Sequence, residues 1–240
     1  MSEHDAHYNM GDFRFAHSPK TLQARQRKYL RYFQNSPVSQ EHPVLDLGCG
    51  RGLFLSLLEE NGIAGYGVDA SAEALAEYHG ACETVQSEIL AYLERAESAG
   101  RFGGVFCSHV IEHLAPPEFE RLTRLIARAL VPGGVAIFIT PNPVNLHVLS
   151  DSFWLDMSHV RPYPEPLIVR ICQENGLTDR VDGGWDLDTA PRQPVYKWPL
   201  HIARRILLGR AYYQGEDAFA VMRKPRSIEP AKREDTQESR

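Results

Sequence analysis

Short apolar runs alternate with longer segments of helical periodicity along most of the chain. The apolar runs predict strands at residues 44–48, 64–69, 83–87, 103–108 and 134–140. The segments between and after them predict helices at 52–61, 71–79, 88–98, 117–130 and 164–175. Alternation of this kind is typical of a parallel sheet whose two faces are covered by helices. We therefore predict an α/β fold with a doubly wound, mostly parallel sheet.

The two ends of the chain and two internal stretches depart from this pattern. We predict a poorly ordered segment at 1–18, a basic helix at 19–33, a last strand at 217–223 and a disordered tail at 226–240. Residues 141–163 and 184–215 are rich in Pro, Trp, Tyr and His. We expect them to cap the carboxyl ends of the strands, where α/β proteins bind substrates. The predicted organisation is a tail and helix (1–38), one main domain (39–225) with these two insertions, and a tail (226–240).

Composition narrows the choice of partners and compartment. The chain has 240 residues, 43% of them hydrophobic, and a net charge of −5, so nucleic acid is not an expected partner. Its four cysteines form no C-x-x-C pair, and we expect Cys49 and Cys107 to be buried, reduced thiols. No apolar run approaches the ~18 residues of a membrane span, and the N-terminus lacks the apolar core of a signal peptide. These features predict a cytoplasmic protein.

The run VLDLGCGRGL at 44–53 is the first chemical signal. An apolar strand leads into Gly48, Gly50 and Gly52, and a helix begins directly behind them. Glycine permits positive φ and a close approach of backbone to ligand, and a helix N-terminus favours negative charge. The next strand ends in Asp69, an acid placed to accept hydrogen bonds from a ribose. This arrangement predicts a nucleoside-bearing cofactor across the carboxyl ends of two strands.

The details of the loop decide which cofactor we expect. A dinucleotide fingerprint would require a third glycine where Leu53 stands, and no G-K-[ST] follows, which excludes a phosphate-binding P-loop. Asp46 precedes the first glycine by two residues. The pattern D-x-G-x-G-x-G resembles the first motif of the class I S-adenosylmethionine-dependent methyltransferases. LVPGGVAIFITPNP at 130–143 resembles a later stretch of that family, and the resemblance covers about residues 40 to 225.

The resemblance implies a Rossmann-like, seven-stranded sheet with helices on both faces, and S-adenosylmethionine as the cofactor. It places Asp46 near the amino group of the cofactor, Asp69 on the ribose, and Glu88 and Ile89 at the adenine. A solvated acid at a helix start is the alternative for Glu88. The cofactor-binding set that it implies is Asp46, Gly48, Cys49, Gly50, Gly52, Asp69, Ala70, Glu88, Ile89 and His109.

A second chemical signal follows the fourth predicted strand, where His109, Glu112 and His113 form H-x-x-E-H. This string matches an inverted zinc-protease motif, but that motif needs a helix, and Pro116 and Pro117 interrupt one here. The segment resembles the xxEHL stretch of small-molecule methyltransferases, including the ubiquinone-biosynthesis type. Some of those bind a divalent cation through an acidic first position, which is His109 in this chain. We therefore predict no metal, with His109, Glu112 and His113 as weak candidate ligands, and His113 near the reacting centre.

The segment FWLDMSHVRPY at 153–163 is the third signal. It resembles D-x-x-H-V-R-P segments of bacterial methyltransferases associated with O-antigen and capsular polysaccharide genes. Trp154 and Tyr163 offer rings that can stack on a sugar, and Arg161 offers a bidentate contact to a phosphate or carboxylate. Asp156 and His159 form either a pair in which the acid orients the base or an anchor for the loop.

These residues predict the reaction. A hydroxyl acceptor must lose its proton, and histidine is the side chain suited to this at neutral pH, so His113, His159 and Arg161 are the predicted catalytic residues. We predict methyl transfer to a sugar hydroxyl or sugar-linked anionic group of a bacterial surface glycan or its precursor. The alternatives are a small-molecule O-methyltransferase acting on a quinone-type phenol, an NAD-dependent oxidoreductase, and a non-catalytic protein that binds the cofactor.

The segment 197–213 has a basic amphipathic pattern. Trp198, Ile202, Ile206 and Leu207 can share one face of a helix, with Lys197, Arg204, Arg205 and Arg210 elsewhere. Such a helix suits either a lid over the site or a peripheral contact with an anionic membrane. The sequence predicts a glycan or small-molecule acceptor as the main partner and leaves the oligomeric state open.

Overall fold

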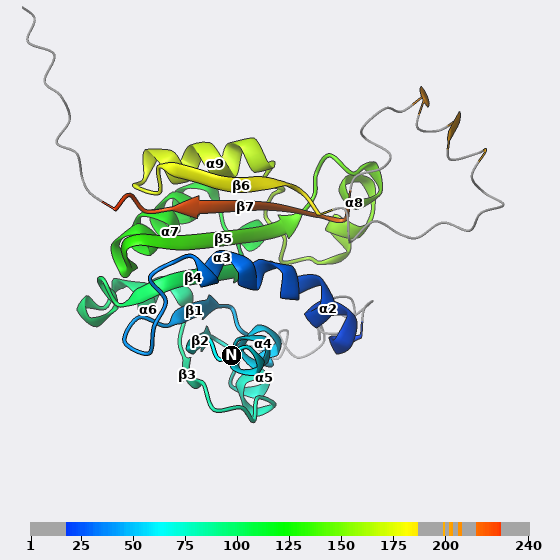
Figure 1. Cartoon of the computed structure of the whole chain (residues 1–240). Coiled ribbons are helices and arrows are strands. Elements are labelled where there is room, and N and C mark those ends of the chain that lie inside the picture. The colour runs from blue at the N-terminus through cyan, green and yellow to red at the C-terminus, as the bar shows by residue number, and fades with distance from the viewer. Residues whose placement is uncertain (1–17, 187–198, 200–201, 204–205, 208–214, 227–240) are drawn as a thin grey trace, which may run out of the picture.

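The fold is a seven-stranded mixed sheet with helices on both faces (Figure 1). The computed structural model describes residues 18–186, 199, 202–203, 206–207 and 215–226. The strands are β1 (Val44–Leu47), β2 (Gly65–Asp69), β3 (Glu83–Gln86), β4 (Phe102–Ser108), β5 (Leu130–Pro141), β6 (Asp179–Trp185) and β7 (Asp217–Arg223). Their order is β3-β2-β1-β4-β5-β7-β6, and β7 runs antiparallel to both of its neighbours. This confirms the predicted class I methyltransferase fold.

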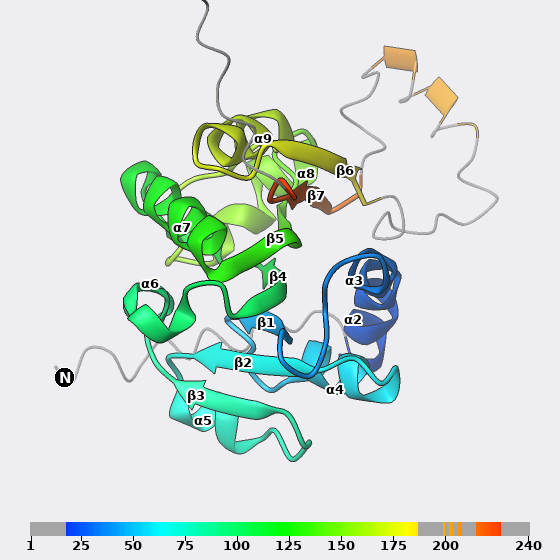
Figure 2. The ribbon, with the colours of Figure 1, turned by 60° about the vertical axis from the view of Figure 1, so that its left-hand side comes forward.

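The helices lie in two layers. The α-helices are α2 (Pro19–Gln26), α3 (Leu30–Gln34), α4 (Leu53–Glu60), α5 (Ala72–Ala76), α6 (Ile89–Glu94), α7 (Pro116–Ala129), α8 (Leu146–Ser150) and α9 (Glu165–Glu174). Single 3-10 turns are η1 (Arg27–Tyr29), η2 (Ala96–Ser98), η3 (Ile111–His113) and η4 (Ser152–Leu155). Figure 2 shows α6 and α7 on one side of the sheet and α2, α3 and α4 on the other.

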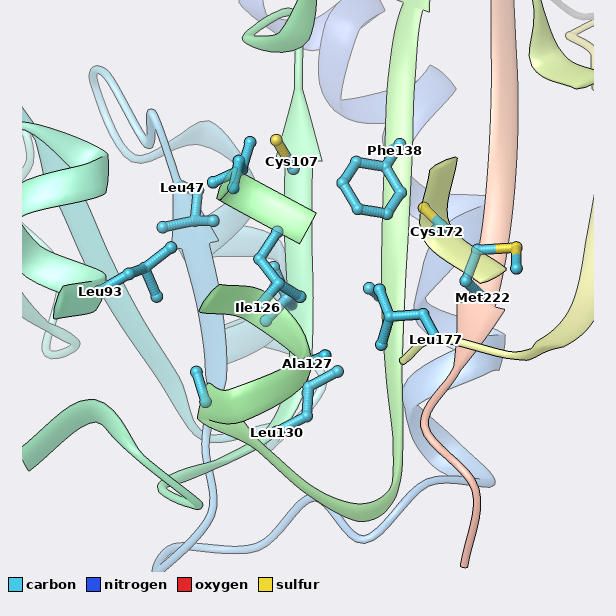
Figure 3. Close-up of a cluster of buried hydrophobic side chains, with 14 of the residues drawn as sticks. Leu47, Leu93, Cys107, Ile126, Ala127, Leu130, Phe138, Cys172, Leu177 and Met222 are labelled. Atoms are coloured by element: carbon cyan, nitrogen blue, oxygen red, sulfur yellow. The ribbon is translucent and has the colours of Figure 1, made fainter. Parts of the chain in front are cut away.

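Each face of the sheet supports its own core, because side chains alternate along every strand. On one face Leu47, Cys107, Phe138 and Met222 pack against side chains of α6, α7 and α9 (Figure 3). On the other face Val44, Phe106 and Ile137 belong to a cluster with residues of η1, α3 and α4. Within that second cluster the Phe54 and Phe106 rings stack with their centroids 3.6 Å apart. The buried thiols predicted at Cys49 and Cys107 are confirmed.

The structure corrects several predicted boundaries. β5 starts at Leu130, earlier than the strand predicted at 134–140, and its pairing with β4 jumps from Phe102↔Leu130 to Gly104↔Val135. The extra residues bulge out at Gly133, which has φ +83°. The predicted helices at 71–79 and 88–98 are shorter, and the one at 19–33 is divided by η1. The segment 141–163 holds α8 and η4, although no regular element is predicted there.

β6 is the strand that the hydrophobic pattern misses, and part of it falls in a stretch predicted to be irregular. It reads DRVDGGW, lies at the edge of the sheet, and has no fully buried residue. Because both faces of this edge strand are at least partly exposed to solvent, its sequence lacks the apolar run that marks β1 or β4.

The basic N-terminal segment is joined to the sheet by ion pairs. Arg25 meets Glu216 at 3.3 Å, and Lys28 contacts the buried Asp186, which also accepts a hydrogen bond from Tyr29 at 3.1 Å. Arg25 and Lys28 of this segment are therefore paired with acidic side chains of the same protein.

No helix in the described parts of the chain is long and apolar enough to cross a bilayer. The predicted tails and most of the segment 184–215, with its amphipathic stretch, lie outside the described residues.

Candidate active site

The glycine loop joins β1 to α4 at the carboxyl edge of the sheet. Gly48, Gly50 and Gly52 have φ of +73°, +52° and +71°, which L-residues with side chains rarely adopt. A Cβ on Gly48 would lie 2.8 Å from Val110 and 3.9 Å from Ile89, and one on Gly52 would enter the ring of Tyr78. A Cβ on Gly50 would meet nothing within 4 Å. The loop is thus packed at both ends and open at its centre.

Two carboxylates stand beside the open centre of the loop. Asp69 accepts hydrogen bonds from the backbone N–H groups of Gly50 and Ser71, both at 2.8 Å. Asp46 is buried, and its burial together with the charge of Asp69 raises its pKa to about 8. A buried acid of this kind is stabilised when a cation binds next to it. The open space at Gly50 and the two acids fit a cofactor that carries an amino group and a ribose.

The other residues predicted to bind the cofactor lie around this loop or follow the neighbouring strands. Cys49 is buried, and Ile89 lies near Gly48. Ala70 and Glu88 are exposed just beyond β2 and β3, and Glu88 precedes α6 without a side-chain cap bond. His109 follows β4 with φ +55°, the one positive value among non-glycine residues in the described ranges. Strain of that kind is common at functional sites.

Glu112 links β4, β5 and the first insertion. Its side chain is fully buried, with one oxygen 3.2 Å from His109 Nδ1 and the other accepting a hydrogen bond from Thr140 at 3.1 Å. Its backbone carbonyl accepts from the N–H groups of Val160 and Arg161 at 2.8 and 3.3 Å. Burial pushes the pKa of Glu112 upward, but the hydrogen bond and charge of His109 outweigh it, so the pKa is lowered. Glu112 is therefore an ionised anchor for the segment that carries His159.

The two predicted catalytic histidines come together. The rings of His113 and His159 lie with centroids 4.8 Å apart, although the two residues are far apart in the sequence. His113 Nδ1 is 2.8 Å from Ser158 Oγ, and His159 Nδ1 is 2.6 Å from the Phe153 carbonyl. Asp156 lies between them, with Oδ1 2.6 Å from Ser158 Oγ and Oδ2 3.8 Å from His159 Nε2. Asp156 also accepts the Ser158 N–H at 2.9 Å and so closes a turn, which fits the loop-anchor alternative, while its 3.8 Å separation from His159 Nε2 exceeds a hydrogen bond.

Among the residues that the structure describes, Glu112, His113 and His159 form a cluster that could hold a metal ion, with ligand atoms within 4.8 Å of one another. This set replaces the predicted candidate His109 by His159. One oxygen of Glu112 contacts His109 and the other accepts a hydrogen bond from Thr140, so both oxygens are held in place by neighbouring side chains. The H-x-x-E-H string lies on the η3 turn and its approach, not on a long helix, which removes the zinc-protease alternative.

The remaining residues of the first insertion differ in exposure. Arg161 is half-buried, with its guanidinium 5.1 Å from the centre of the Tyr163 ring. Tyr163 is completely buried and donates a hydrogen bond to the Leu114 carbonyl at 2.8 Å, so its ring belongs to the core and cannot stack on a sugar. Trp154 is 57% exposed and remains available for stacking.

Sequence reasoning missed three polar residues of this region. Ser158 bridges His113 and Asp156, Thr140 holds Glu112, and Asp217 Oδ1 lies 3.6 Å from His109 Nε2. Thr140 and Asp217 lie where β5 ends and β7 begins, at the carboxyl edge of β5, so their topological position could have marked them. Ser158 carried no signal of its own, because serine is common in loops.

Comparison with known proteins identifies the family. A family model described as a methyltransferase domain matches residues 16–180, which is more than half of the chain. The chain therefore belongs to this methyltransferase family. A crystal structure of an S-adenosylmethionine-dependent methyltransferase from Archaeoglobus fulgidus is 26% identical, with a TM-score of 0.72 over 91% of this chain and 100% of that one.

Two further comparisons gave matches to named enzymes. The ubiquinone biosynthesis O-methyltransferase of Coxiella burnetii is 30% identical over 117 residues, which are 47% of this chain and 49% of that protein. The match thus spans about half the length of this curated relative. The structure of Haemonchus contortus phosphoethanolamine N-methyltransferase 2 contains S-adenosylhomocysteine, and it shares the fold at 20% identity with a TM-score of 0.59, over 83% of this chain and 52% of that one.

The chain is an S-adenosylmethionine-dependent methyltransferase. This overturns the oxidoreductase alternative.

Proposed function

We propose that this methyltransferase transfers the methyl group to a hydroxyl oxygen of its acceptor, with His113 accepting the hydroxyl proton. The observation that carries the proposal is the pairing of His113 and His159, whose ring centroids are 4.8 Å apart. The proposal is supported by Val110, three residues before His113, which packs on Gly48 of the glycine loop that we propose as the cofactor site. His159 completes the pair, and Arg161 lies on the same insertion.

The chemistry is a displacement at a methyl carbon. S-adenosylmethionine supplies an electrophilic methyl group on a positively charged sulfur. The new O–C bond forms as the C–S bond breaks, and the hydroxyl proton passes to the imidazole, which later releases it to water. Positioning contributes most of such a rate enhancement, and general base catalysis adds about 10²–10⁴-fold.

A phenolic hydroxyl is the acceptor class that we favour. Phenols ionise near pH 10, whereas a free imidazole has a pKa of about 6.5, so proton transfer from a phenol is within reach of a histidine. A sugar hydroxyl is a weaker acid than a phenol, so its deprotonation requires a stronger base. The printed name of the Coxiella burnetii relative, an O-methyltransferase of ubiquinone biosynthesis, points the same way.

A hydroxyl of a bacterial surface glycan is the second candidate. The D-x-x-H-V-R-P segment supports it, as does Trp154, whose exposed indole suits a sugar face. Arg161 would hold an anionic group of such an acceptor through its guanidinium.

The test measures S-adenosylhomocysteine released from the methyl donor, with a panel of catechols, hydroquinones and glycan oligosaccharides as acceptors. We expect turnover with a phenol, and a loss of about 10²–10⁴-fold in kcat for His113→Ala and a smaller loss for His159→Ala. His147→Ala is the matched control, because this exposed histidine on α8 lies outside the His113–His159 pair, with its side chain 3.9 Å from Asp151. Equal turnover of His113→Ala and His147→Ala would contradict the proposal, and turnover with glycans alone would select the second candidate.

We also propose a peripheral membrane contact through the segment 197–213. Ile202, Ile206 and Leu207 are 57%, 77% and 80% exposed, and basic residues surround them in the sequence. Co-sedimentation with anionic liposomes should decrease when Arg204 and Arg205 are both changed to Glu. Unchanged co-sedimentation would favour the lid alternative.

A further inference from the structure

A short chain of contacts connects His113 to a carboxylate in the first insertion. Ser158 Oγ lies 2.8 Å from His113 Nδ1 and 2.6 Å from Asp156 Oδ1. The same Asp156 oxygen accepts the backbone N–H of Ser158 at 2.9 Å, which keeps the carboxylate in place under the hydroxyl. All three side chains are partly buried, so water competes weakly for these contacts.

The direction of these hydrogen bonds follows from counting protons. An ionised carboxylate has none to donate, so the Ser158 hydroxyl must donate to Asp156. A hydroxyl has a single proton, so Ser158 Oγ can only accept from His113. His113 Nδ1 must then carry a proton, and in the neutral ring the basic lone pair belongs to Nε2.

We propose that Ser158 and Asp156 are positioning residues that fix His113 in the Nδ1–H tautomer and so assign Nε2 as its basic nitrogen. The inference rests on the proposed function for its catalytic meaning. When Nε2 takes the proton of the acceptor, Nδ1 keeps its own proton and its bond to Ser158. Asp156 stabilises the resulting imidazolium through the hydroxyl between them, and no second proton moves.

The insertion is held tightly enough to perform this task. Val160 N donates a hydrogen bond to the Glu112 carbonyl at 2.8 Å, and Glu112 directly precedes His113 in the sequence. A backbone hydrogen bond therefore connects the segment that carries Ser158 to the segment that carries His113. Ser158 lies two residues before Val160. The distance between His113 and Ser158 is therefore controlled by the buried Glu112 and not by the exposed part of the loop.

His159 provides an internal reference for the tautomer. Its Nδ1 lies 2.6 Å from the Phe153 carbonyl, which can only accept, so this ring is also protonated at Nδ1. Its partner is a backbone atom, so a substitution at Ser158 does not remove it.

The decisive experiment needs no acceptor. Long-range ¹H–¹⁵N correlation spectra of the ¹⁵N-histidine-labelled full chain, recorded well above the ordinary histidine pKa of about 6.5, report which ring nitrogen carries the proton. We expect His113 and His159 both to be Nδ1–H in the wild type. Ser158→Ala should shift His113 toward Nε2–H and leave His159 unchanged, and Ser158→Thr should restore the wild-type pattern. Ser150→Ala is the matched control, because its hydroxyl in the same insertion bonds the Leu146 carbonyl at 2.6 Å.

Activity is the second readout, with the acceptor found in the panel above. Ser158→Ala should lower kcat about tenfold with KM changed less than about twofold, while Ser158→Thr and Ser150→Ala remain near wild type. An Nε2–H signal for His113 in the wild type would overturn the inference, and so would an unchanged tautomer in Ser158→Ala. A full kcat in Ser158→Ala despite a shifted tautomer would overturn the positioning role. Loss of the proposed function appears differently, as an active His113→Ala enzyme.

Discussion

Gly50 and Gly62 have similar positive φ values, but only one of them borders the proposed cofactor site. Their φ values are +52° and +65°, and a Cβ at either position would meet nothing within 4 Å. Alanine at each should therefore lower the free energy of unfolding by a similar amount, about 1–2 kcal/mol, through left-handed strain alone. Only Gly50 borders the proposed cofactor space. We predict that Gly50→Ala weakens S-adenosylhomocysteine binding at least about tenfold, and that Gly62→Ala leaves it unchanged.

Calorimetric titration with S-adenosylhomocysteine measures this difference, and denaturant unfolding checks that the two variants lose similar stability. Equal binding by both variants would show that the open space at Gly50 is not part of the cofactor site.

Asp46 couples stability to pH. Its pKa is raised from 3.8 to about 8 by burial and by the charge of Asp69. Between those pH values the native state keeps a proton that the unfolded chain has lost, so the contribution of Asp46 becomes increasingly destabilising from about pH 4 to about pH 8. Asparagine cannot ionise. Asp46→Asn should therefore raise the Tm at pH 8 by roughly 2–6 °C in the absence of ligand, and have little effect near pH 4.

The same substitution should weaken cofactor binding about 10–100-fold, because a neutral amide cannot pair with an ammonium group. Thermal unfolding across pH and calorimetric titration measure the two effects. A Tm that falls in Asp46→Asn at pH 8 would mean that the carboxylate is stabilised by the fold itself.

At the scale of elements, a buried carboxylate directly after β6 connects the N-terminal segment to the sheet. Asp186 is 2% exposed and contacts both Lys28 and Tyr29. Removing it leaves these partners without their buried acceptor, so Asp186→Ala should lower the free energy of unfolding by about 2–4 kcal/mol.

The exposed pair between Arg27 and Glu60, at 2.8 Å, is the matched control, and Arg27→Ala should cost less than about 1 kcal/mol. Urea unfolding of both variants measures the difference. Similar losses would indicate that Asp186 does not hold η1 to the sheet.

The same scale explains which elements the sequence could predict. β1 and β4 are buried on both faces, so their apolar runs mark them clearly. β6 is charged and exposed at the edge, and α8 has five residues in a loop-like stretch, so neither leaves a periodic signal. The glycine loop could be predicted because its characteristic residues lie close together in the sequence. The contact of Ser158 with His113 could not, because it forms only when the insertion folds back over η3.

At the scale of the whole molecule, the two halves of the site are specified in different ways. The glycine loop, which we propose as the cofactor site, follows β1 beside the parallel strand β2, so its position depends on the topology that the family shares. The residues expected to meet the acceptor lie on η3 and on the insertion after β5, which the sheet does not constrain. This is why the family identifies the methyl donor and leaves the acceptor to experiment.

That division predicts a ligand response of the intact chain. S-adenosylhomocysteine at about 100 times its Kd should stabilise the native state by about 2.7 kcal/mol, which for a chain of this size raises the Tm by roughly 5–10 °C. NAD should produce no shift in Tm. A dinucleotide site needs glycine for close helix–strand packing at the position that Leu53 occupies here, and Leu53 is the first residue of α4. Thermal unfolding with each compound compares them directly. A Tm shift with NAD as large as that with S-adenosylhomocysteine would contradict the assignment of the loop. A Tm shift with S-adenosylhomocysteine that is lost in Gly50→Ala but kept in Gly62→Ala would locate the binding at the loop's open centre.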